Sequence, residues 1–87
     1  LIYNSFMKYE NQIKNYLEKK SSKLISINDG LLSQGIIDSL GLIELVAFIE
    51  ESFDVTFKSD DLNIENFESI KKLCVHIKKI DNGKSKL

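Results

Sequence analysis

Ser39 is the residue whose surroundings most suggest chemistry, because it lies between Asp38 and Leu40 where a loop enters a predicted helix. The segment over residues 35–41 reads Gly-Ile-Ile-Asp-Ser-Leu-Gly. The start of a helix presents backbone N–H groups without intrahelical partners and the positive end of the helix dipole, which together favour a phosphate attached there. Ser39 is therefore a candidate for a phosphate-linked modification.

Two other roles compete for Ser39. As an N-cap, its hydroxyl would accept a hydrogen bond from a free backbone N–H and contribute about 1 kcal/mol. As a catalytic nucleophile, it would need a base within reach. The only histidine is His76, and the Gly-x-Ser-x-Gly pattern of hydrolases is absent around Ser39. Modification by a separate enzyme needs no such base, and the residues favour it.

Apolar residues at helical spacing predict the elements that position Ser39. Three main helices are expected over about residues 4–20, 39–53 and 68–80, with one short helical turn over 60–63. The resulting fold class is all-α, a small bundle with a long loop between its first two helices. The polar segment 81–87 contains a glycine typical of the end of a helix and is expected to fray.

Three further expectations concern packing. The long connection over 21–38 is rich in leucine and isoleucine, so its apolar side chains are expected to point inward, and loops of this length are often functional. Asn66 or Ser69 is expected to cap the last helix. The inward stripe of the second helix is expected to consist of Leu42, Val46, Ile49 and Phe53, with Leu45 beside it.

The 87 residues are expected to form one domain over 1–87, with its core at about 7–80. The net charge of −1 hides a strong segregation, because residues 38–61 hold seven carboxylates and a single lysine. Such a region is expected to steer basic partners toward it. Arginine is absent and no basic groove lined by aromatic residues is evident, which argues against nucleic-acid binding.

Cysteine, histidine and hydropathy constrain the remaining possibilities. No apolar run is long enough to span a bilayer, no secretory signal is evident, and a single cysteine favours a reducing cytoplasm. Met7 is a possible native start. Cys74 is expected in the core and His76 on the surface, and the two together are too few for a metal site.

The order of elements resembles the acyl and peptidyl carrier protein family over about residues 7–80. The motifs that carry this resemblance are Gly35-x-x-Asp38-Ser39-Leu40, Glu44-Leu45, Ile49-Glu50-Glu51-x-Phe53 and Asn66-Phe67-x-Ser69-Ile70. The resemblance implies that Ser39 carries a covalent 4′-phosphopantetheine arm derived from coenzyme A and attached by a phosphopantetheinyl transferase. It also implies a carrier rather than an enzyme, which holds acyl, aminoacyl or peptidyl groups as thioesters.

The same resemblance suggests roles for the neighbours of Ser39. Asp38 is expected to cap the second helix and to contribute to the transferase complex. Leu40 and Ile43 are expected to lie beside the arm, to contact partner enzymes and to be partly exposed. The clustering of acidic residues next to Ser39 favours a docking surface over ordinary solvated charge. The expected partner-binding residues are Ile43, Glu44, Ala47, Glu50 and Glu51.

Gly41 departs from many fatty-acid carriers, which have an acidic or polar residue after Asp-Ser-Leu. Together with the weak net charge, it favours small free-standing carriers such as D-alanyl or aminoacyl carrier proteins. A glycine there would let a partner or the arm approach the backbone closely. The expected partners are loading, adenylating or acyl-transferring enzymes, and the chain is expected to be a monomer. The alternative is an unmodified helical interaction module with a carrier-like fold.

Overall fold

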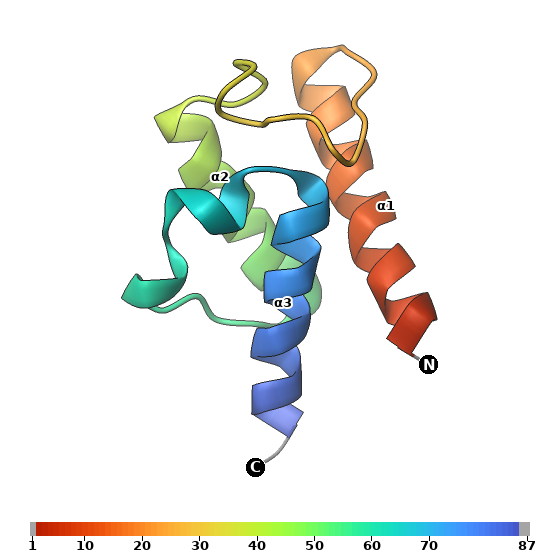
Figure 1. The fold of residues 1–87 in the computed structure, drawn as a ribbon, viewed down its shortest axis with the longest axis vertical. Coiled ribbons are helices and arrows are strands. Elements are labelled where there is room, and N and C mark those ends of the chain that lie inside the picture. The colour runs from red at the N-terminus through yellow and green to blue at the C-terminus, as the bar shows by residue number, and fades with distance from the viewer. Residues whose placement is uncertain (1, 86–87) are drawn as a thin grey trace.

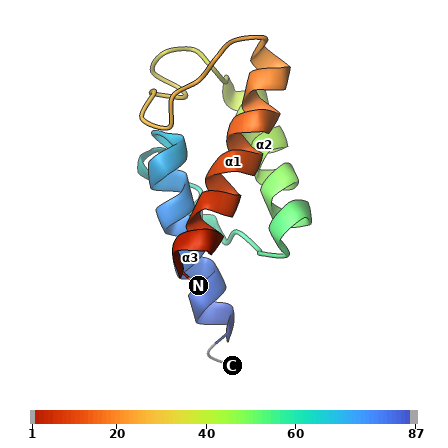
Figure 2. The ribbon, with the colours of Figure 1, turned by 90° about the vertical axis from the view of Figure 1, so that its right-hand side faces the viewer.

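The computed structural model describes residues 2–85, and these residues fold as the predicted all-α bundle (Figure 1). Its main helices pack side by side, and Figure 2 shows α1 crossing the other two. No strand occurs in the described part of the chain, and no helix there is long and apolar enough to cross a membrane. The elements are α1 (Ile2–Ser21), α2 (Ser39–Phe53), η1 (Ser59–Asp61), η2 (Ile64–Phe67) and α3 (Ile70–Ser85), where η denotes a 3₁₀-helix.

α1 forms because apolar side chains recur along one of its faces. The buried members of this face are Tyr9, Ile13 and Leu17. The helix begins two residues earlier and ends one residue later than the predicted range 4–20. It ends where Ser22 adopts the left-handed conformation at φ 58°. The Tyr9 hydroxyl donates a hydrogen bond of 2.8 Å to Asp81 of α3, and burial raises the pKa of Tyr9 to about 12.

The connection between α1 and α2 crosses one end of the bundle, where α2 begins (Figure 1). Two backbone hydrogen bonds of 3.0 Å hold it against the junction of η2 and α3, from Leu31 N–H to the Glu68 carbonyl and from Lys71 N–H to the Ile27 carbonyl. Most of its apolar side chains pack inward as predicted, with Ile25, Leu31 and Ile37 buried. The expectation is wrong for Leu24, which is 93% exposed.

α2 turns the predicted face inward, with its most deeply buried side chains shifted toward Leu45. Its buried residues are Leu45 and Ile49, whereas the predicted Leu42, Val46 and Phe53 are only partly buried. These three still pack against the core, so the predicted stripe is confirmed, and the neighbouring helices decide which of its members are covered most. α2 ends at Asp54, whose left-handed φ of 55° turns the chain back.

The segment between α2 and α3 contains two 3₁₀-helices where one short turn was expected. η1 overlaps the predicted range 60–63, and η2 follows it. The Asn63 side chain caps η2 by accepting a hydrogen bond of 3.0 Å from Asn66 N–H. Val55, Phe57 and Phe67 anchor the segment in the core. Elements of three or four residues are too short to show a period, which is why the second one was missed.

α3 begins at Ile70, two residues after the predicted start. Of the two predicted caps, Ser69 is correct: its hydroxyl accepts a hydrogen bond of 3.2 Å from Lys72 N–H, whereas Asn66 lies within η2. The helix continues to Ser85, past the predicted end at Ile80 and through the glycine expected to stop it. Fraying of the tail stays a prediction, and residues 86–87 lie outside the described part.

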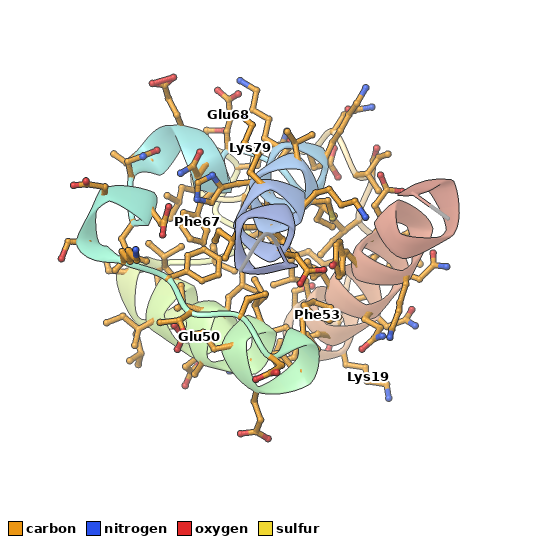
Figure 3. All side chains as sticks on the ribbon, turned by 90° about the horizontal axis from the view of Figure 1, so that it is seen from below. Lys19, Glu50, Phe53, Phe67, Glu68 and Lys79 are labelled. Carbon is orange, nitrogen blue, oxygen red and sulfur yellow. The ribbon has the colours of Figure 1, made fainter. Side chains whose placement is uncertain are left out.

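Aromatic rings fill much of the space between the helices. Tyr16 of α1 stacks on Phe48 of α2 with ring centroids 4.2 Å apart. Phe57 and Phe67 pack together at 5.8 Å, and the Phe53 ring meets the edge of Tyr9 at 4.8 Å. Figure 3 shows Phe53 and Phe67 among the helices and Lys19 directed away from them.

Candidate functional site

Ser39 is the first residue of α2 and is exposed. The cap of this helix is Asp38, in extended backbone conformation, whose carboxylate accepts a hydrogen bond of 2.8 Å from Gly41 N–H. The capping role suggested for Asp38 is therefore confirmed, and the N-cap role considered for Ser39 is wrong. The fold does not need the Ser39 hydroxyl to cap its helix, so that hydroxyl is available for chemistry.

Gly41 allows the loop before Ser39 to pack closely against the first turn of α2. A Cβ atom added to Gly41 would lie 3.2 Å from Cβ of Ile37 and 3.3 Å from the Asp38 carboxylate, tighter than ordinary van der Waals contact. A side chain here would push against the residue that caps the helix. Internal packing is thus one reason for the glycine that the sequence analysis connected with a partner or an arm.

Apolar side chains next to Ser39 face solvent. Leu40 and Ile43 are 64% and 66% exposed, and Ala47 is also exposed. The exposure expected for Leu40 and Ile43 is confirmed. Residues 40, 43 and 47 are spaced by three and four, so they lie on one face of α2. Ser39 therefore adjoins an apolar strip that folding leaves uncovered.

The three glutamates predicted to bind partners have different surroundings. Glu51 is exposed. Glu44 is half exposed and forms an ion pair with Lys20 at the end of α1. Glu50 is half-buried, and its carboxylate accepts a hydrogen bond of 2.8 Å from Phe57 N–H, so it fastens the segment after α2. Glu50 therefore has a structural role that the sequence analysis missed.

A shallow groove of about 320 Å³ lies beside Ser39 between α1, the preceding loop and α2. Asp38 and Leu40, the two neighbours of Ser39, both contribute to its lining. Its wall is mixed, with apolar, aromatic and charged groups. The other lining residues are Tyr16, Leu17, Lys20, Ser21, Gly35, Ile36, Ile37, Gly41 and Glu44.

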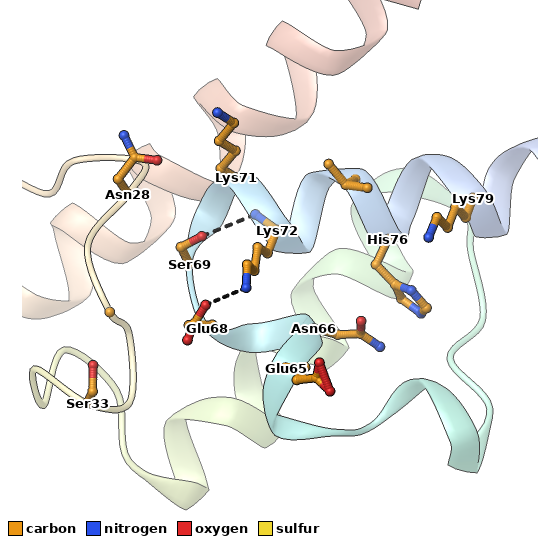
Figure 4. A pocket seen from close by; sticks show the side chains of 12 residues that line it. Asn28, Ser33, Glu65, Asn66, Glu68, Ser69, Lys71, Lys72, His76 and Lys79 are labelled. Carbon is orange, nitrogen blue, oxygen red and sulfur yellow. Dashed lines mark hydrogen bonds and ion pairs between the residues drawn. The ribbon is translucent and has the colours of Figure 1, made fainter.

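A larger groove of about 700 Å³ runs along α3, and Figure 4 shows the polar side chains around it. Several of its polar side chains already have hydrogen-bond or ion-pair partners within the protein. Glu68 pairs with Lys72 at 2.6 Å, the Ser69 hydroxyl caps α3, and His76 Nε2 lies 2.8 Å from Asp61 Oδ1. The expectation of an exposed His76 is wrong, since its side chain is only 17% exposed. This pairing leaves His76 with a structural contact rather than an open site.

Cys74 and the titratable groups offer no second site in the described part of the chain. Cys74 is buried as predicted, and burial raises the pKa of its thiol to about 12, so it is an unreactive core residue. No group of three or more histidine, cysteine, aspartate or glutamate side chains among the described residues is placed to hold a metal ion. The candidate site is therefore the exposed start of α2.

The start of α2 fits a phosphate-linked group. Ser39 and Leu40 head the helix, so their N–H groups have no carbonyl partner within it and can face an anion. The Ser39 side chain is exposed, and the adjoining Leu40 and groove offer both apolar and polar contacts. Such contacts suit an arm that combines a phosphate, amides and methyl groups.

The family comparison agrees with this geometry. Residues 12–77 match the family described as "Phosphopantetheine attachment site", which covers most of the chain and includes α2. The chain belongs to this family of acyl and peptidyl carrier proteins, whose domains are attachment sites for 4′-phosphopantetheine and serve as carriers that modifying and loading enzymes act on. A comparison with curated protein sequences found no significant match.

Two residues of the site were not found by sequence reasoning, Tyr16 and Lys20. Both lie in the last turns of α1, more than 20 residues before Glu44. Lys20 Nζ lies 5.7 Å from the centroid of the Tyr16 ring, besides pairing with Glu44. Its hydrogen bond to Glu44 raises the pKa of Lys20. The abundance of lysines in α1 hid this one, because nothing local distinguishes it from Lys19.

Proposed function

We propose that Ser39 is the residue that carries the 4′-phosphopantetheine arm. The observation that carries this proposal is that Ser39 heads α2 with an exposed side chain while Asp38 caps the helix. Its oxygen would bond to the phosphorus of coenzyme A that bears pantetheine. The pyrophosphate linkage at that phosphorus would break, releasing adenosine 3′,5′-bisphosphate, and the hydroxyl would lose its proton. The bound arm ends in a thiol, which forms thioesters with acyl, aminoacyl or peptidyl groups.

The other residues of the site would recognise enzymes rather than react. Asp38 would present its carboxylate to the transferase, and Leu40 would lie beside the arm. The exposed apolar strip of Ile43 and Ala47, flanked by Glu44 and Glu51, supports docking of enzymes that have a basic surface with an apolar centre. Exposed charges accelerate such encounters more than they tighten them, which suits a carrier that visits several enzymes.

Glu50 is a weaker candidate for docking than its two neighbours. Its carboxylate is already engaged by Phe57 N–H, so a partner's cation would share it with the backbone. We retain Glu50 in the proposed docking surface only as a flanking charge. The partners proposed are a phosphopantetheinyl transferase and a loading enzyme of the adenylating or acyl-transferring kind. We also propose that the protein is a monomer and that it is located in the cytoplasm, where Cys74 stays reduced.

We propose that the carrier serves a fatty-acid, polyketide, nonribosomal-peptide-like or aminoacyl-transfer pathway. Within these, the cargo we propose is an aminoacyl or specialised acyl group rather than the long chains of bulk fatty-acid synthesis. The supporting observation is the aromatic filling of the interior, with Phe57 and Phe67 buried and Phe48 and Phe53 packed against the core. These rings occupy interior volume that a long chain would need. A chain that did enter would stabilise the fold by about 0.8 kcal/mol per CH₂.

The cargo proposal is tested by loading the modified protein with C4, C8 and C12 acyl groups and measuring the melting temperature of each form. We expect the three temperatures to agree closely, because the chains remain largely in solvent. A melting temperature that rises steadily with chain length would instead place the chain inside the bundle.

The attachment proposal is tested by intact mass after incubation with coenzyme A and a broad-specificity phosphopantetheinyl transferase. The parent should gain one group of about 340 Da. Ser39→Ala should gain none and should keep its helical circular dichroism, because Asp38 still caps α2. Ser52→Ala, an exposed serine of the same helix, is the matched control and should be modified as the parent is. An unmodified parent would support the interaction-module alternative.

A further inference from the structure

Lys20 occupies a position where two groups attract a cation. Its ammonium pairs with the Glu44 carboxylate of α2 and lies 5.7 Å from the centroid of the Tyr16 ring, within the range of cation–π attraction. The ion pair with Glu44 joins the end of α1 to the first half of α2. One carboxylate and one aromatic face thus form a small cation site that a residue of the same chain fills.

The Tyr16 ring and the backbone of Glu44 are held in place independently of Lys20. Tyr16 stacks on Phe48 with the ring planes only 14° apart, which fixes the ring between α1 and α2. Glu44 follows the capped first turn of α2, one residue before the fully buried Leu45. Lys20, by contrast, is a lysine on the last turn of α1 with about half of its side chain exposed. Tyr16 and the backbone of Glu44 would therefore keep their positions if Lys20 moved away.

We propose that Tyr16 and Glu44 form a cation-binding site that Lys20 fills in the free chain and that an arginine of a docking enzyme takes over. Glu44 belongs to the proposed docking surface, so this inference rests on the proposed function. Arginine is the fitting occupant because its planar guanidinium stacks on aromatic rings, binds carboxylates through two N–H groups and is more weakly hydrated than an ammonium.

Displacement of Lys20 would also change the groove beside Ser39. Lys20 and Glu44 both line this groove, together with Leu40 and Gly41. The ion pair joins α1 to α2 next to the attachment site. Replacement of Lys20 by an enzyme's arginine would therefore change the lining of the groove beside the arm when the enzyme docks. Exposed ion pairs are weak, so the internal pair can be replaced at small cost.

The test compares initial rates of modification at low salt for the parent and three variants, with coenzyme A and one phosphopantetheinyl transferase. Lys20→Gln empties the site and should raise the rate about two- to fivefold, the range expected for an exposed ion pair. Lys20→Arg fills it with the better-fitting cation and should lower the rate. Lys19→Gln removes the same charge from the neighbouring exposed position and should change the rate less than Lys20→Gln does.

The specific part of the effect is isolated in a Glu44→Gln background. There, Lys20→Gln should have no more effect than Lys19→Gln, because the carboxylate that both cations compete for is gone. The inference is overturned if Lys20→Gln and Lys19→Gln act equally in the parent background, or if Lys20→Arg is modified faster than the parent.

Binding of the same transferase to these variants in a Ser39→Ala background separates this inference from the proposed function. Fluorescence anisotropy should give the same order of affinities without any modification taking place. A parent that is not modified at Ser39 would refute the attachment proposal while this order of affinities still held. A modified parent with equal affinities across the Lys20 variants would refute the cation site alone.

Discussion

α2 and α3 are nearly equal in length, yet they use their apolar residues in opposite ways. α3 is the less apolar in sequence, but its inner residues Ile70, Leu73, Cys74 and Ile77 are all fully buried. α2 is the more apolar, but only Leu45 and Ile49 are buried, and it exposes Leu40 and Ile43 to solvent. An apolar surface that folding leaves uncovered is a mark of an interaction surface. α3 thus serves mainly the core, and the outer face of α2 is the surface that we propose for docking.

The strongest test of this contrast replaces one isoleucine in each helix. Ile77→Ala should lower the free energy of unfolding by about 2–5 kcal/mol, because it leaves a cavity in the core. Ile43→Ala should change it by less than about 0.5 kcal/mol, since Ile43 is exposed, and should slow modification of Ser39. Urea unfolding and initial modification rates measure the two effects. Equal losses of stability in the two variants would show that Ile43 of α2 contributes to the core as much as Ile77 of α3 does.

Two adjacent glutamates sharpen the contrast within α2. Glu50→Ala should cost about 1–3 kcal/mol of unfolding free energy, because Phe57 N–H loses its acceptor in a half-buried position. Glu51→Ala should leave stability nearly unchanged and should slow modification at low salt. Raising the salt concentration should reduce the difference in modification rate between the parent and Glu51→Ala. If the Glu51→Ala variant is modified at the parent's rate at every salt concentration, Glu51 is an ordinary solvated charge with no role in docking.

Asp38 caps α2 and is proposed to serve the transferase, and two substitutions separate these two roles. Asp38→Ala should cost about 0.5–2 kcal/mol through loss of the cap on α2. Asp38→Asn should keep most of that stability, because asparagine caps helices well. Both should slow modification if the Asp38 carboxylate serves the transferase. Thermal unfolding paired with modification rates distinguishes the two roles, and an Asn variant modified at the parent's rate would leave Asp38 with the cap alone.

The smallest effect is expected from acid, at the contact that joins η1 to α3. Asp61 accepts a hydrogen bond from Lys58 N–H and lies beside His76, and these contacts hold the pKa of Asp61 below its usual value. A lowered folded-state pKa gives stability that is present above the unfolded value of about 4 and is lost as the pH falls through the folded value. Urea midpoints should therefore fall less between about pH 5 and pH 3 for Asp61→Asn than for the parent. Identical pH profiles would show that this contact contributes no pH dependence.

The helical period and local chemistry predicted much of the fold and the centre of the site. Repeating apolar positions located α1, α2 and α3, and the Asp38 cap follows from an acidic residue directly before an apolar helix. The buried Cys74 follows from its place on the inward stripe of α3. These features depend on residues within a turn or two of each other, which is the range over which sequence patterns carry information.

What sequence reasoning missed depends on contacts between segments that are distant in the chain. Glu50 reaches Phe57 only because Asp54 turns the chain back, and Lys20 meets Glu44 only because α1 and α2 pack together. His76 is mostly buried where η1 brings Asp61 to it. A local hydrophobic period does not predict such long-range contacts. They also decide which charged residues of this chain are free for partners.

The measurement that tests the central claim most directly is the location of the arm in the unmutated chain. After reaction with coenzyme A and the transferase, tandem mass spectrometry of the digested protein identifies the modified residue. The account predicts a single phosphopantetheine on Ser39, with the other exposed serines, such as Ser33 and Ser52, unmodified. An arm on any other residue, or a chain that gains none, would contradict it.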